Sequence, residues 1–145
     1  MGVICPCGVN VHAFKENQKV KFAQRCLPIS GNLTYEADLC TSTLEISTLS
    51  LKYEDKKTEG EIYSFLFTAN AFTSICCKQE GLSCIVTVKG TGMINNTQYS
   101  FEAIFIDNQA QDEEDIIEKF VIKKYFHQNG IVSVPNGSIA AKGCQ

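Results

Sequence analysis

The chain has 145 residues, the size of one domain that buries about two-thirds of its unfolded surface in a single core. An apolar content of 44% and a charged content of 20% are typical of a folded globular protein and argue against disorder. A net charge of −3 gives no electrostatic footprint for nucleic acid or an anionic membrane. No apolar run approaches the roughly 20 residues of a membrane-spanning helix, so neither nucleic acid nor a membrane span is expected.

The first residues, MGVICPCGVNVHAF, lack the basic and long apolar regions of a signal peptide. We therefore expect a protein that is used without Sec export or that has already been trimmed. Eight cysteines are many for a reduced cytosol, although they are fewer than in a disulfide mini-scaffold.

Residues 1–17 are predicted to form an extended N-terminal arm, and residues 18–145 the core domain. Pro6 excludes a helix through Cys5 and Cys7. Apolar residues then alternate with polar ones as far as Phe14, so part of the arm is suited to adding a strand to a sheet edge. The polar run 15–18 ends it.

Alternating apolar runs predict short strands over 19–26, 33–40, 43–53 and 62–72. In the third run the alternation changes phase at Ser47-Thr48, which predicts a bulge or a strand that crosses between two sheets. The fourth run is dense in apolar residues and predicts a strand buried on both faces.

The strongest pattern is a hairpin made by Leu82–Val88 and Gln98–Ile106, with an Asn-Asn turn between them. Gly90-Thr91-Gly92, between these runs, predicts a tight turn or bulge. Just upstream, Cys76 and Cys77 are adjacent. Their side chains are expected on opposite faces of an extended chain, one toward the core and one outward.

An acidic loop is predicted over 107–115, and the segment 116–126 fits either a helix or a strand. Its β-branched and aromatic residues favour a strand. A short strand follows at 131–134, and residues 138–144 close the domain. Eight or nine short strands separated by turns predict an all-β, single-domain β-sandwich of jelly-roll or related Greek-key type.

No motif in the chain predicts catalysis or a cofactor. Structural zinc sites favour C-x2-4-C pairs, which are missing here, so no metal is expected. The only histidines are His12 and His127, and neither accompanies a nucleophile motif. The acidic loop lacks the spacing and glycine of an EF-hand. We therefore expect a protein that is not an enzyme.

The cysteines carry the functional hypothesis. Cys5 and Cys7 flank one proline, so each is expected to pair elsewhere, and an arm of ten residues reaches roughly 33 Å. Cysteines near chain ends are poor core residues and good cross-links. The candidates for intermolecular disulfides are Cys5, Cys7, Cys76, Cys77 and Cys144. The candidates for internal thiols or disulfides are Cys26, Cys40 and Cys84.

A chain with a Cys-Pro-Cys near its N-terminus, a β core and a cysteine near its C-terminus resembles structural proteins of the bacterial endospore surface. These include coat morphogenetic proteins and endospore appendage subunits. The resemblance implies synthesis in the mother-cell cytoplasm without a signal peptide, and self-assembly on a spore or cell surface. It also implies disulfides from an N-terminal connector, here Cys5 and Cys7, to neighbouring subunits. A second similarity, over residues 90–143, is to β-sandwich modules of secreted bacterial proteins.

The leading hypothesis is a self-assembling subunit of a bacterial surface layer or filament, joined by terminal cysteines and by β-edge contacts. Its partners would be copies of itself and other spore-surface proteins. The alternative hypothesis is a monomeric, secreted-type binding module that recognises a carbohydrate or a protein.

Overall fold

A computed structural model describes residues 5–110 and 112–144, and most of them belong to β-strands. Two short 3-10 segments, η1 (Thr41–Ile46) and η2 (Glu59–Glu61), lie in connections. The strands are β1 (Gly8–Phe22), β2 (Ile29–Cys40), β3 (Thr48–Asp55), β4 (Phe65–Glu80), β5 (Ser83–Ile94), β6 (Thr97–Asn108), β7 (Asp115–Ile122), β8 (Phe126–His127), β9 (Val132–Val134) and β10 (Ile139–Lys142).

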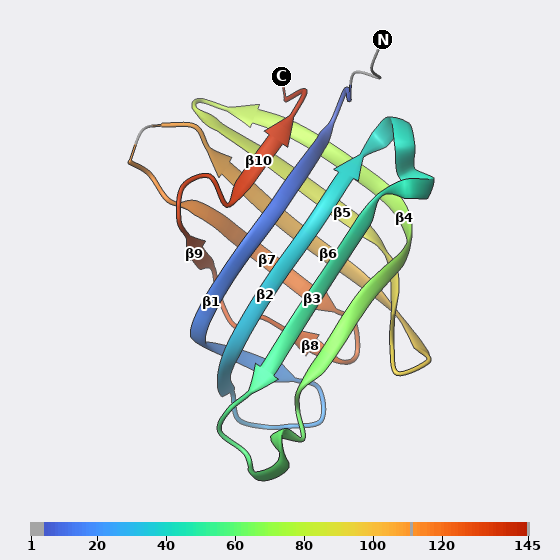
Figure 1. The fold of residues 1–145 in the computed structure, drawn as a ribbon, viewed down its shortest axis with the longest axis vertical. Coiled ribbons are helices and arrows are strands. Elements are labelled where there is room, and N and C mark those ends of the chain that lie inside the picture. Colours follow the sequence, from blue (N-terminus) through green and yellow to red (C-terminus); the bar gives the residue numbers. More distant parts are fainter. Residues whose placement is uncertain (1–4, 111, 145) are drawn as a thin grey trace.

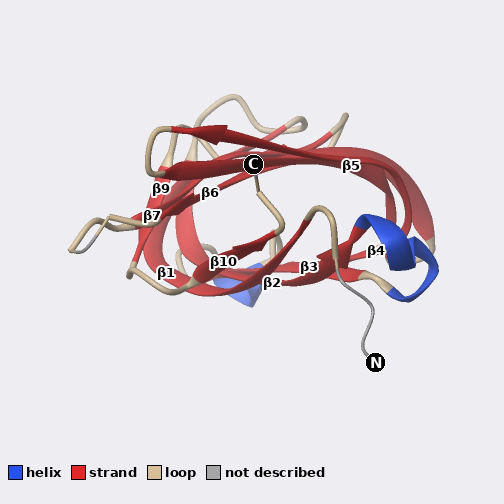
Figure 2. Cartoon of the chain, turned by 90° about the horizontal axis from the view of Figure 1, so that it is seen from above, coloured by secondary structure: helices blue, strands red, loops and turns tan. Residues whose placement is uncertain are grey.

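Each strand from β1 to β8 pairs antiparallel with the next one along the chain, and β8 pairs with the end of β1. This closes a barrel (Figure 1). β10 extends the sheet beside the start of β1, and β9 pairs with β7. From above the barrel is flattened, with β1, β2, β3 and β10 in one layer and β5, β6 and β7 in the other (Figure 2).

The expected all-β class is confirmed. The strand order, however, is that of an up-and-down meander, whereas a jelly roll or Greek key would place strands distant in sequence side by side. Alternation identifies the buried face of a strand, but it does not specify which strand becomes the neighbour.

The predicted arm is part of the barrel from Gly8 onward. β1 runs through the expected boundary at residue 17 and pairs with β2 and β10 of its own chain. The polar run 15–18 is a bulge: the register with β2 shifts between Lys15 and Gln18, and Asn17 has a φ of 52°. Residues 1–4 lie outside the described residues.

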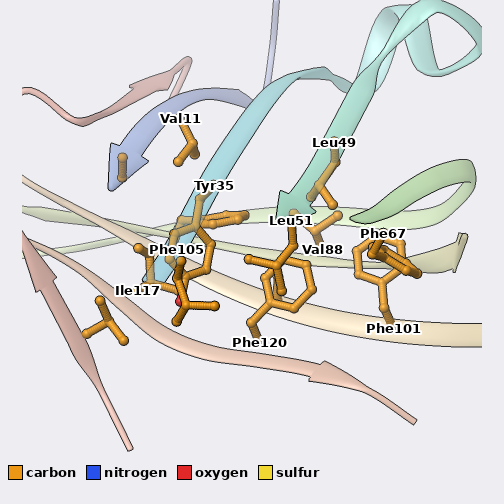
Figure 3. Close-up of a cluster of buried hydrophobic side chains, with 14 of the residues drawn as sticks. Val11, Tyr35, Leu49, Leu51, Phe67, Val88, Phe101, Phe105, Ile117 and Phe120 are labelled. Carbon is orange, nitrogen blue, oxygen red and sulfur yellow. The ribbon is translucent and has the colours of Figure 1, made fainter. Parts of the chain in front are cut away.

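Inward-facing side chains from all the long strands fill the barrel (Figure 3). The predicted β5–β6 hairpin is confirmed. Its turn at Asn95 and Asn96 has positive φ angles of 46° and 68°, as a type I′ turn requires. Aromatic residues dominate the core, and Phe101 and Phe120 stack with centroids 6.0 Å apart. The largest fully buried side chains are Tyr35, Tyr53, Phe67, Phe101, Phe105, Phe120, Leu33, Leu39, Leu49, Leu51, Ile117 and Ile122.

The strands β3, β4 and β7 differ in how closely they follow the prediction. The phase change at Ser47 marks the end of η1, where the Ser47 Oγ donates to Thr43 O (3.0 Å), so the predicted long strand begins only at Thr48. β4 is buried on one face, since Leu66 is 57% exposed beside the buried Phe67. The ambiguous segment 116–126 is a strand as far as Ile122, as predicted.

Gly90 and Gly92 lie within β5 rather than in a turn. A side chain at Gly90 would overlap the carbonyl of Ala71, and one at Gly92 would overlap the ring of Phe67. The register of β4 shifts opposite this stretch, so the two strands approach closely here and admit only glycine.

Candidate functional site

Three disulfides join segments that are distant in sequence: Cys5–Cys40, Cys7–Cys77 and Cys84–Cys144. Their Cα separations are 5.7, 5.7 and 6.0 Å. Cys5 is tied to the end of β2, in its own layer. The other two bonds connect the start of β1 and the segment after β10 with β4 and β5, across the flattened barrel (Figure 2). The end of the barrel where both chain termini lie is therefore covalently closed.

This pairing replaces the expected intermolecular roles of Cys5, Cys7, Cys77 and Cys144. Since β1 is an integral strand, Cys5 and Cys7 remain beside β2 and β4, where they are bonded to Cys40 and Cys77. Cys40 and Cys84, expected as internal, are each bonded within the chain.

Two cysteines of the described chain are free, Cys26 and Cys76, and both are exposed. Cys26 was expected to be internal, but it lies in the connection after β1. Cys76 points outward while its neighbour Cys77 is partly buried in a disulfide, as the alternation of a strand predicts.

Two carboxylates, one of them fully buried, hold the C-terminal segment against the barrel. Asp115 is fully buried and accepts hydrogen bonds from the backbone N–H groups of Asn108 (3.0 Å), Gly137 (2.9 Å) and Ile139 (3.0 Å). Asp107 accepts one from the N–H of Ala141 (2.8 Å). Burial raises the pKa of Asp107 above its ordinary value. The hydrogen bond from Ala141 opposes this shift, and the nearby charge of Asp115 adds to it. These carboxylates have a structural role.

At the opposite end of β1 a groove of about 390 Å³ lies over the seam between β1 and β8; we call it the basal groove. Its polar lining is basic, with no acidic residue among the groups that border it. The full lining is Lys21, Phe22, Ala23, Arg25, Cys26, Val121, Ile122, Lys124, Tyr125, Phe126 and His127.

The charge of the basal groove comes from two acid-free segments. Residues 17–35 and 119–145 contain no Asp or Glu but carry seven of the 13 Lys and Arg residues. Pairing of β1 with β8, and of β8 with β7, brings these segments together. The low overall net charge concealed this separation. The run of sequence without acids was the signal that could have revealed it.

The side chains that commonly bind metal ions are not clustered in the described residues. No group of three or more His, Cys, Asp or Glu side chains there has the geometry to hold a metal ion. His12 is exposed with its Nδ1 3.5 Å from Glu36 Oε1, and His127 is exposed in the basal groove. None of the helices in the described part of the chain is long and apolar enough to span a membrane.

Comparison of the chain with protein-family models, with curated proteins and with solved structures finds no match in any of the three.

Proposed function

We propose that the protein is a self-assembling structural subunit of a bacterial surface layer or filament, on a cell or spore surface, joined to its neighbours by disulfides of Cys26 and Cys76. One observation carries the proposal. Six of the eight cysteines are bonded within the chain, and the two that remain are both exposed. Three internal disulfides also suit a protein that works outside a reducing cytosol.

The two thiols lie near opposite ends of β1. Cys26 borders the basal groove, where Phe22 pairs with Phe126, whereas Cys76 is adjacent to the Cys77 that is bonded to Cys7. β1 has 15 residues, which reach up to about 46 Å at the rise of an extended strand. Thiols this far apart cannot pair within one subunit, but each can pair with another copy.

Linking two thiols removes two protons and transfers two electrons to an oxidant, such as molecular oxygen or a small disulfide. A subunit with two such thiols extends into a chain, and a subunit with one stops at a dimer. Replacing Cys26 or Cys76 alone therefore tests the proposal.

Non-covalent contact can come from the outer side of β4. Pairing with β3 ends at Thr68, so within residues 5–110 and 112–144 the stretch Ala69–Glu80 is paired only with β5. Bulges and the charged Lys78 and Glu80 limit promiscuous pairing of this edge, while leaving it open to a matching edge of another copy.

The test is oxidation of the purified protein, followed by negative-stain microscopy and non-reducing gels. We expect wild type to form reductant-sensitive multimers, Cys26→Ser and Cys76→Ser each to stop at dimers, and the double variant to remain free of covalent multimers. Wild type that stays monomeric under oxidation would overturn the proposal.

A second candidate, a monomeric binding module for a carbohydrate or protein, is favoured by the internal bonding of the terminal cysteines and by the basal groove. A monomer in both redox states that is retained by an immobilised polysaccharide would support it.

A further inference from the structure

We propose that the basal groove of one subunit binds the acidic β6–β7 loop of the next, through Asp112, Glu113 and Glu114. The inference rests on the proposed function and adds a second non-covalent contact to the one at the β4 edge. The interface is head-to-tail, because the two surfaces differ and both belong to every subunit.

The basal groove concentrates positive charge, and no ion pair among the described side chains involves the basic residues that line it. Lys21 and His127 are directly opposite each other on β1 and β8, so two basic side chains adjoin at this seam. Arg25 lies over the Tyr63 ring at 5.3 Å, and its position beside the groove is fixed without a carboxylate. Lys124 lies at the turn between β7 and β8, with a φ of 68°.

The acidic loop is held in place at its base. Asn136 donates from Nδ2 to the carbonyls of Asn108 (3.1 Å) and Glu113 (2.7 Å), and the Nδ2 of Asn108 donates to Glu114 O (2.7 Å). Asp112, Glu113 and Glu114 are all exposed. Described ion pairs involve none of the three, so their carboxylates are available to an incoming cationic surface.

The loop and the groove lie at the two ends of β7. The loop precedes Asp115 and the groove includes Ile122, so the two surfaces are about 23 Å apart along the strand. Figure 1 shows the loop at the upper left and the β7–β8 turn below and to the right. Within one subunit they cannot meet. Between subunits, the loop of one copy can bind the groove of the next, and repetition of this contact builds a linear assembly.

Charge complementarity favours a second copy over an unrelated anion. Outside the two acid-free segments, the chain has 16 acidic and six basic residues. Every subunit therefore carries one acidic loop for each basal groove. Opposite charges of this kind attract at low salt and are screened beyond about 10 Å at roughly 0.1 M salt.

The test uses Cys26→Ser/Cys76→Ser protein, so that only non-covalent association is measured by sedimentation velocity. The basal reversal is Lys21→Glu/Lys124→Glu, the loop reversal is Glu113→Lys/Glu114→Lys, and the charge swap combines all four. Lys52→Glu/Lys89→Glu is the matched control, because it makes the same charge change at exposed positions away from the groove.

We expect association that weakens as salt is added. Each reversal should weaken the association constant by about tenfold or more, and the charge swap should restore it. The control variant should associate like the parent protein. Reversals that behave like the control would overturn the inference. If cysteine-containing wild type still forms reductant-sensitive chains in that case, the proposed function survives and only this contact fails. Wild type that remains monomeric in every condition overturns both. Binding of an acidic polysaccharide without self-association also overturns the inference and favours a binding module.

Discussion

The hydroxyl of Tyr35 donates a 2.6 Å hydrogen bond to Oε1 of Gln128 inside the barrel, across 93 residues of sequence. The Nε2 of Gln128 donates in turn to the carbonyls of Ile117 (2.8 Å) and Gly130 (3.1 Å). This network joins β2 to the strands that close the barrel. Tyr53 differs: in the described structure its buried hydroxyl has no hydrogen-bond partner.

Loss of the hydroxyl is expected to change the free energy of unfolding differently at the two tyrosines. Tyr35→Phe leaves the Gln128 acceptor buried and unpaired, and we expect a loss of about 1–3 kcal/mol in the free energy of unfolding. Tyr53→Phe removes an unpaired group and should be neutral or stabilising. Urea unfolding of the two variants beside wild type measures both. Equal destabilisation by the two substitutions would contradict the described network.

Each internal disulfide is expected to contribute to stability by closing a long loop. The sequence separations are 35, 70 and 60 residues, and for loops of that length the chain-entropy account gives about 4 kcal/mol each. We expect Cys7→Ser/Cys77→Ser and Cys84→Ser/Cys144→Ser to lower the melting temperature strongly in calorimetry. Cys26→Ser is the control and should leave it unchanged, because Cys26 is exposed and free.

The fold class and the hairpin could be predicted because they depend on local alternation. Val86 and Val88 are buried on one face of β5, as the pattern requires, and Asn95-Asn96 forms the predicted turn. Barrel closure could not be predicted in the same way. It depends on the pairing of Phe22 with Phe126, over 100 residues apart, and nothing local distinguishes that contact from a sandwich edge.

The cysteine pairing could not be predicted from the sequence for the same reason. Cys5 and Cys40 come together only because β1 and β2 are paired with Gly8 opposite Cys40. Position near a chain end predicts external cysteines, but Cys7 and Cys144 are bonded to β4 and β5.

Removal of the buried Asp115 carboxylate should loosen the segment around Ile139, which stays joined to the barrel by the Cys84–Cys144 disulfide. In Asp115→Asn one oxygen becomes a donor and at least one of the three bound N–H groups loses its acceptor. We expect a loss of about 2 kcal/mol in the free energy of unfolding. Hydrogen exchange should show faster exchange of the Ile139 amide. Unchanged protection there would contradict the role given to Asp115.

Asp55 gives stability that depends on pH. Burial alone would raise its pKa, but hydrogen bonds from the Thr58 side chain and from the N–H groups of Lys57, Thr58 and Tyr63 outweigh burial and lower it. The unfolded state therefore binds the proton more readily, so this stability is present above the ordinary Asp pKa of about 4 and is lost below it.

We expect Asp55→Asn to be destabilised relative to wild type at pH 7, with a difference that shrinks as the pH falls below about 4. Urea unfolding at several pH values measures this difference. Glu54→Gln is a suitable control, since it changes a neighbouring carboxylate that lies at the protein surface. A difference that stays constant from pH 7 down to pH 3 would contradict the lowered pKa.

The most direct test of the account is mass-spectrometric disulfide mapping of oxidised monomers and multimers, digested without reduction. We predict Cys5–Cys40, Cys7–Cys77 and Cys84–Cys144 peptides in both, with additional cross-linked peptides of Cys26 and Cys76 only in multimers. Cross-links between subunits through Cys5, Cys7 or Cys144 would contradict the account and return the linking role to the chain ends.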